Sequence, residues 1–228
     1  MSTFAEQAAA PFVPRLRAGT ALRKAVRSFY EHSFRLVIFN SLFSAVAIAV
    51  LVLALYQPAA LILLLLLGPL AAALMHCAVT IVREDDLRLV DALVGLRLHW
   101  RRGFVLGAVA SGVALLTVVA VVFYAGRGAL AWPLAVLTLY LSGMFGVYQL
   151  ALWPLAVVER DRPLRAVFRG AAYTLLGRPF AFTGLAVALL LINLIGLVLA
   201  ILPFLTMTLS YSFLAAAYLT LPQVSEEA

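Results

Sequence analysis

Charge is scarce in this sequence of 228 residues, and long stretches have none. Only 12% of the residues are charged and 65% are apolar, whereas soluble domains have about 25% and about 45–50%. Asp, Glu, Lys and Arg are absent from four runs, each longer than the ~18 apolar residues typical of a membrane span: 36–82, 103–126, 128–158 and 179–225. The pattern excludes a soluble enzyme, a nucleic-acid-binding protein and a disordered tail. It predicts an all-α, polytopic membrane helical bundle.

Cysteine is almost missing too. Cys77 is the only cysteine, so the chain has no intrachain disulfide and no Cys/His spacing typical of a metal site. The sequence also lacks the phosphate loop GxxxxGK[ST], the zinc-protease motif HExxH and the serine elbow GxSxG. We therefore expect no catalytic residue, no metal and no cofactor, and hence a protein that is not an enzyme.

The charge-free runs predict about six spans. A spanning helix needs about 20 residues, so the two longest runs must each reverse, at turns that contain Pro58 and Pro203. We expect one membrane domain over 20–222, between a mobile tail at 1–19 and a second tail at 223–228. The last span is short and contains Thr and Ser, so a re-entrant segment is its alternative. The expected spans are 36–55, 59–82, 104–124, 130–158, 180–200 and 204–221.

The basic residues predict the orientation. Of 17 Lys and Arg, 16 lie before the first span, between the second and third, or between the fourth and fifth, and Arg127 alone lies on the other side. Cytoplasmic loops carry such an excess of bases. Arg outnumbers Lys by 16 to one, which we interpret as the composition of a GC-rich bacterium. We therefore expect the bacterial cytoplasmic membrane, with the N-terminus and, given six spans, the C-terminus in the cytoplasm.

Three cytoplasmic segments, 20–35, 87–102 and 163–176, have the 3.6-residue period of amphipathic helices. Asp85 and Asp86 are expected to cap the start of the second helix, and Asp161 that of the third. The second and third align at an offset that pairs Arg102 with Arg178, so we predict three repeats of an interfacial helix followed by a transmembrane hairpin. Such helices lie among lipid headgroups or form a platform for a protein partner, and the first role is favoured. The expected partner or lipid contacts are Arg88, Arg97, Trp100, Arg102, Arg165, Phe168, Arg169 and Arg178.

Polar residues inside the spans are few. In the second span Gly68, Ala72, His76 and Thr80 recur every four residues, and such a row of small residues favours close helix packing in lipid. We expect this row to face the bundle interior, with His76 in a structural role. The alternative is a polar cavity lined by His76, Thr80, Tyr148, Gln149 and Asn193. Further small-residue rows predict close packing elsewhere: Ala108/Gly112, Ser142/Gly146 and Gly184/Ala188.

Two stretches resemble the YesL-like family of bacterial membrane proteins, whose domain has no known function. They are 68–107, which opens with GPLAAAL and leaves the second span as REDD, and 152–180, which contains LWPLAVVERDRPLRAVFRG. The second stretch is also similar to the membrane domain attached to some glycerophosphodiester phosphodiesterases, although no phosphodiesterase active-site segment is present. The YesL-like resemblance implies a role beside carbohydrate permeases of the ATP-binding-cassette type, and it transfers no site residue.

Three functions fit these observations. The leading hypothesis is a non-enzymatic accessory subunit that docks a membrane-protein partner, such as a sugar permease, through its cytoplasmic helices. The alternative is a small transporter or channel for a neutral or amphiphilic solute, which would use the interior polar residues. A third is lipid binding, in which the cytoplasmic arginines hold anionic membrane lipids. No nucleic-acid partner is expected.

Overall fold

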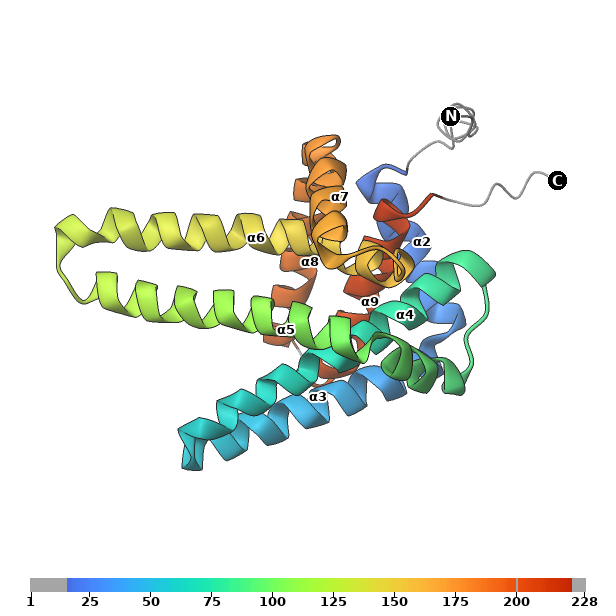
Figure 1. Ribbon diagram of the computed structural model, residues 1–228, viewed down its shortest axis with the longest axis horizontal. Coiled ribbons are helices and arrows are strands. Elements are labelled where there is room, and N and C mark those ends of the chain that lie inside the picture. Colours follow the sequence, from blue (N-terminus) through green and yellow to red (C-terminus); the bar gives the residue numbers. More distant parts are fainter. Residues whose placement is uncertain (1–15, 200, 223–228) are drawn as a thin grey trace.

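The computed structural model describes residues 16–199 and 201–222, and over these ranges the chain contains helices and no strand (Figure 1). Residues 1–15 of the predicted N-terminal tail and all of the predicted C-terminal tail, 223–228, lie outside the described residues, whereas residues 18 and 19 already belong to α2. The elements are α2 (Ala18–Glu31), α3 (Ser33–Tyr56), η2 (Pro58–Leu66), α4 (Leu67–Glu84), α5 (Leu89–Ala125), η3 (Ala129–Ala131), α6 (Trp132–Val158), α7 (Leu164–Leu176), α8 (Pro179–Leu199) and α9 (Ile201–Thr220).

Five helical segments are long and apolar enough to cross a membrane: Ser33–Tyr56, Ala59–Glu84, Leu89–Ala125, Trp132–Val158 and Pro179–Val198. They confirm the all-α polytopic bundle. Helix α9, which covers the predicted sixth span, is not one of the five, so the count of six stays a prediction. Helix α8 ends at Leu199 and α9 begins at Ile201, so the chain leaves one helix for the next beside the reversal expected near 201–203. Pro203 itself lies in the first turn of α9, where proline is tolerated.

The first and third amphipathic segments form separate helices, but the second does not. Helix α2 corresponds to 20–35 and α7 to 163–176, whereas 87–102 and the third span form the single 37-residue helix α5. Helix α5 contains no proline, so nothing in it removes a backbone hydrogen bond. The expectation of an interfacial helix separate from the third span is therefore wrong.

Helix boundaries near the charged loops also differ from the predicted caps. Asp85 and Asp86 were expected to cap the start of a helix, but Asp85 ends α4 in a left-handed conformation with φ 51°. The N-cap of α5 is Arg88, whose backbone N–H donates to Asp91. Pro163, rather than Asp161, is the N-cap of α7. Aspartate tolerates the left-handed region better than most residues, which suits Asp85 to a helix end.

Burial is concentrated at one end of the molecule, which we call the core end. There α9 contacts α2, α3, α4, α6 and α8. Buried side chains gather in 71–79 of α4, 151–157 of α6 and 214–219 of α9. The described ends of the chain and the loops after α4 and α6 lie around this end in Figure 1. The base-rich segments therefore share one end of the fold.

Away from the core end, the hairpins α3–η2/α4, α5/α6 and α8/α9 diverge (Figure 1). In the outer parts of α5 and α6, only Ala135 is buried among the residues from 108 to 150 whose burial the structure describes. Large apolar side chains there are exposed, such as Leu116 at 69%. Apolar surface of this extent needs an apolar surrounding, which the hydrocarbon of a membrane provides.

Candidate functional site

Helices α4 and α5 touch backbone to backbone through glycine. A β-carbon at Gly103 would lie 2.7 Å from the Cα of Pro69, and one at Gly107 would lie 2.5 Å from the Cα of Gly68. Gly103 also faces the side chain of Ala72. Only glycine allows helices to approach this closely. The row of small residues at four-residue spacing in α4 therefore faces the interior, as predicted.

The same contact ends in a pair of histidines. The rings of His76 and His99 lie 5.2 Å apart between centroids and are tilted by 46°. Gly95 makes room for His76, because a β-carbon there would stand 2.8 Å from the Cβ of His76. His99 is only 3% exposed, and its Nδ1 has no hydrogen-bond partner among the described residues. The sequence analysis missed His99, although its spacing of four from Gly95 and Gly103 carries the signal.

This pair does not make a metal site by itself. No three His, Cys, Asp or Glu side chains within residues 16–199 and 201–222 are placed so that they could hold a metal ion together, and protein metal sites such as those of zinc use at least three protein ligands. Thr80 donates its hydroxyl to the carbonyl of His76 at 3.0 Å, within one helix. The geometry favours the structural role expected for His76.

The other residues of the predicted cavity make contacts on different helix pairs. Tyr148 donates to the carbonyl of Phe168 at 2.8 Å and joins α6 to α7. Asn193 donates to Leu189 within α8, at 2.8 Å, and reaches Ser212 of α9 at 3.5 Å. Both polar atoms of the Gln149 side chain are buried without a partner in the described parts of the chain. The printed contacts do not join these residues into one site, and the shared cavity stays a prediction.

Two polar contacts that sequence analysis missed hold α9 in the core end. The hydroxyls of Ser28 and Tyr218 lie 2.6 Å apart and link α2 to α9. Asn40 of α3 accepts from the backbone N–H of Ser210 at 3.1 Å and from its hydroxyl at 3.2 Å. Asn40 is the one amide side chain in α3, and an amide in a span is a signal for an interhelical hydrogen bond.

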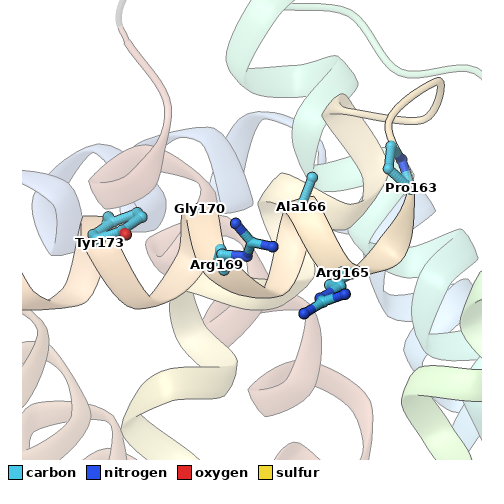
Figure 2. A pocket seen from close by; sticks show the side chains of 6 residues that line it. All are labelled: Pro163, Arg165, Ala166, Arg169, Gly170 and Tyr173. Atoms are coloured by element: carbon cyan, nitrogen blue, oxygen red, sulfur yellow. The ribbon is translucent and has the colours of Figure 1, made fainter.

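The predicted cytoplasmic contacts divide into exposed and internal side chains. Arg97, Arg165 and Arg169 are exposed, and none forms an ion pair with another residue in the described ranges. Trp100 is 52% exposed, and the guanidinium of Arg101 lies 5.3 Å from its ring centroid. Phe168 is internal, because its ring stacks on Tyr148 at 6.3 Å. Arg165 and Arg169 line an open groove on α7 (Figure 2).

Arg102 and Arg178 are engaged inside the fold, which argues against their expected role as free contacts. Arg102 of α5 donates to the carbonyls of Ala156 at 3.2 Å and Glu159 at 3.0 Å, and also to that of Arg162. These carbonyls lie at and just beyond the end of α6. Arg178 donates to Leu219 near the end of α9, at 3.3 Å, and to Leu16.

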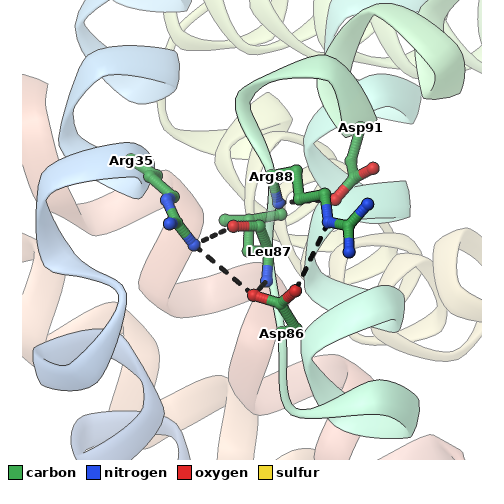
Figure 3. Close-up of polar contacts among 5 residues, drawn as sticks. All are labelled: Arg35, Asp86, Leu87, Arg88 and Asp91. Atoms are coloured by element: carbon green, nitrogen blue, oxygen red, sulfur yellow. Dashed lines mark hydrogen bonds and ion pairs between the residues drawn. The ribbon is translucent and has the colours of Figure 1, made fainter.

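A third arginine also donates to a backbone carbonyl, in the first hairpin. Arg35, near the start of α3, donates to the carbonyl of Leu87 just past the end of α4 (Figure 3). Each of the three hairpins thus has an arginine near the start of its first helix or within it that donates to at least one carbonyl at the end of its second helix or in the loop that follows. Helix C-termini have unpaired carbonyls and partial negative charge, so a guanidinium stabilises them.

Asp86 completes the contact of the first hairpin. It forms ion pairs with Arg35 and with Arg88, each at 3.6 Å, and accepts from the backbone N–H of Leu87 at 2.7 Å (Figure 3). The hydrogen bond from Leu87 lowers the pKa of Asp86, and the charges of Arg88 and Arg35 lower it further. The carboxylate is therefore ionised near neutral pH.

No family model, curated protein or solved structure matches this chain.

Proposed function

We propose that this multi-pass membrane protein is a non-enzymatic docking subunit, which binds a membrane-protein partner through the first turns of α5. The observation that supports it most is an apolar stripe on this helix that the described residues leave uncovered. The stripe consists of Leu89, Leu93 and Trp100, which are 51%, 68% and 52% exposed. We call it the α5 stripe.

The two sides of α5 contrast sharply over these turns. Gly95 and His99 lie against His76 of α4 and are buried. The α5 stripe occupies another side of the helix, since residues at spacings of four and seven share one face. Packing on α4 therefore fixes the direction in which the stripe points.

Lipid is a poor occupant for this stripe. A helix of 37 residues is about 55 Å long at 1.5 Å per residue, whereas the hydrocarbon layer is about 30 Å thick. The excess falls in 88–102, where charges are dense: Arg88, Asp91, Arg97, Arg101 and Arg102. Charged side chains this dense are costly in hydrocarbon, so we infer that this segment lies outside it.

A protein partner suits the stripe better. Large apolar residues every three or four positions are the anchors by which a helix binds in a groove, and tryptophan is enriched among residues that dominate binding energy. Arg97 and Arg101 flank Trp100 in the sequence, so the partner surface should carry acidic residues at its rim. The resemblance to YesL-like proteins makes a carbohydrate permease of the ATP-binding-cassette type the partner to test first.

The test is site-specific photocrosslinking in the native membrane. A benzoylphenylalanine at Leu93 should give a crosslinked adduct with a permease subunit encoded by the same genome. Leu130, 98% exposed and just past α5 at the opposite end of its hairpin, serves as the control position. Equal adducts from both positions, or adducts with lipid alone at Leu93, would contradict docking through the stripe.

Transport is the second candidate, and the buried polar atoms of Gln149 and His99 favour it. Both lack partners within the described residues, and unpaired buried polar groups are costly unless they serve a purpose. Reconstituted protein should then pass a neutral solute across liposomes, and Gln149→Leu should abolish this flux. Flux equal to that of empty liposomes over a broad panel of solutes would exclude transport.

A further inference from the structure

Helix α7 has two opposite faces. Val167 and Ala171 are buried against the bundle. Arg165, Arg169 and Tyr173 follow at spacings of four, and Leu176 closes the same face. At 100° per residue, the two faces lie about 180° apart. The exposed face therefore runs from two guanidinium groups to a large apolar side chain at the end of the helix.

The charged part of this face borders an open groove of about 380 Å³, lined by Pro163, Arg165, Ala166, Arg169, Gly170 and Tyr173 (Figure 2). Neither guanidinium has an ion-pair partner in the part of the chain that the structure describes. The acidic group nearest to Gly170 is Glu159, whose Oε2 would lie 4.0 Å from a β-carbon there, and whose Oε1 already accepts from Arg162 at 3.0 Å. The guanidinium groups of Arg165 and Arg169 can therefore bind an anion.

We propose that this groove binds the phosphate of an anionic membrane lipid, with the acyl chains along Tyr173 and Leu176. Guanidinium groups match phosphate oxygens in charge and in hydrogen-bond geometry. The site is distinct from the α5 stripe and goes beyond the proposed docking function, so either can fail without the other.

The apolar end of the face supports a lipid over free phosphate. Leu176 is 72% exposed, and a free anion would gain nothing from it. Helix α7 connects α6 to α8, two segments long and apolar enough to span. It therefore lies at the level where spans end, which is where lipid headgroups lie. The order of guanidinium, tyrosine and leucine matches the order of phosphate, ester and acyl chain in a phospholipid.

The test measures lipid binding to the full-length protein in mild detergent by native mass spectrometry. Phosphatidylglycerol should bind the wild type well above phosphatidylcholine. The double variant Arg165→Gln/Arg169→Gln should weaken phosphatidylglycerol binding about tenfold at low salt. The control Arg97→Gln/Arg101→Gln removes the same charge from the same end of the fold and should leave binding within about twofold. All substituted positions are exposed, so the fold should persist, which circular dichroism verifies.

Three outcomes would overturn the lipid site. Equal weakening by both double variants would show attraction to the whole basic end and no groove site. Inorganic phosphate that displaces the lipid at equal concentration would identify a free-anion site instead. Finally, Leu176→Asn should weaken phosphatidylglycerol binding and leave phosphate binding unchanged, and an unchanged lipid affinity would remove the acyl contact.

Discussion

The core end and the outer hairpins are built from similar residues but are stabilised differently. Glycine shows this most clearly. Gly68, Gly103 and Gly107 have backbone atoms where a β-carbon would stand, whereas Gly112, Gly143, Gly146 and Gly184 have nothing within 4 Å. In the core end the chain buries its own surface, and in the hairpins it leaves apolar surface for the membrane. Small residues in a span therefore do not by themselves indicate close packing, and the close packing expected at Gly112, Gly146 and Gly184 is wrong within the described residues.

The largest expected difference in stability between the core end and the outer hairpins comes from replacing one glycine in each by valine. Gly103→Val places a β-carbon against the backbone of Pro69, which cannot move aside, and we expect a loss of about 4 kcal/mol or more in the free energy of unfolding. Gly143→Val meets open space in the hairpin and should change the free energy of unfolding by about 0.5 kcal/mol or less. Thermal unfolding in detergent measures both. Similar melting temperatures for the two variants would contradict the α4–α5 contact.

The second comparison uses adjacent arginines. Arg102→Gln removes charge-assisted hydrogen bonds to three carbonyls at the end of α6 and should cost about 2 kcal/mol. Arg101→Gln removes the same charge from an exposed side chain and should cost less than about 0.5 kcal/mol. Melting temperatures of the two variants report the difference. If Arg101→Gln proves the more damaging, the guanidinium of Arg102 does not hold the end of α6.

A smaller contrast concerns single hydroxyl pairs. Tyr218→Phe leaves Ser28 without its buried partner at 2.6 Å, which should cost about 1 kcal/mol. In the outer hairpin, Thr117 and Ser142 also lie 2.5 Å apart, but Thr117→Val should cost only about 0.6 kcal/mol, since interhelical hydrogen bonds in lipid are weak. Denaturant titration of purified protein compares the variants. A larger loss from Thr117→Val would place more of the stability in the hairpins.

The smallest expected effect is a dependence of protein stability on pH, which arises from Asp86 in the loop after α4. The pKa of Asp86 is lower in the folded protein than in the unfolded chain. Its contribution to the free energy of unfolding is therefore fully present above the ordinary aspartate pKa of about 3.9, and it is lost as the pH falls through the lowered pKa. The melting temperature of the wild type should therefore fall between about pH 5 and pH 3 more than that of Asp86→Asn. Parallel curves for the two proteins would mean that Asp86 makes no ionic contribution.

The sequence allowed the long elements to be predicted, because charge-free runs of span length leave few other folds. It also allowed the bounds of α7 and the inward row of α4 to be predicted, since both follow from helical spacing. The continuity of α5 was missed because the charges near Arg102 were interpreted as a helix boundary. Charge marks where a helix leaves the hydrocarbon, and only a breaker such as proline marks where it ends.

The roles of the site residues could be predicted only in part from the sequence, for a physical reason. Arg165 lies in α7 and Arg178 lies just beyond its end, yet Arg165 is exposed and Arg178 donates to a carbonyl of α9. Their different roles depend on how distant parts of the chain pack, which local spacing does not encode. The same holds for Gly103 and Gly112, of which only the first meets another helix.

We expect the hairpins to cross a membrane and the base-rich core end to face the cytoplasm. Single cysteines at Arg127, Leu137 and Arg169, in a Cys77→Ala background, test it with a membrane-impermeant maleimide on intact cells. We predict labelling at 127 from outside, labelling at 169 only after permeabilisation, and none at 137 because water is excluded there. Labelling of 169 from outside, or of 137 under either condition, would contradict the claim.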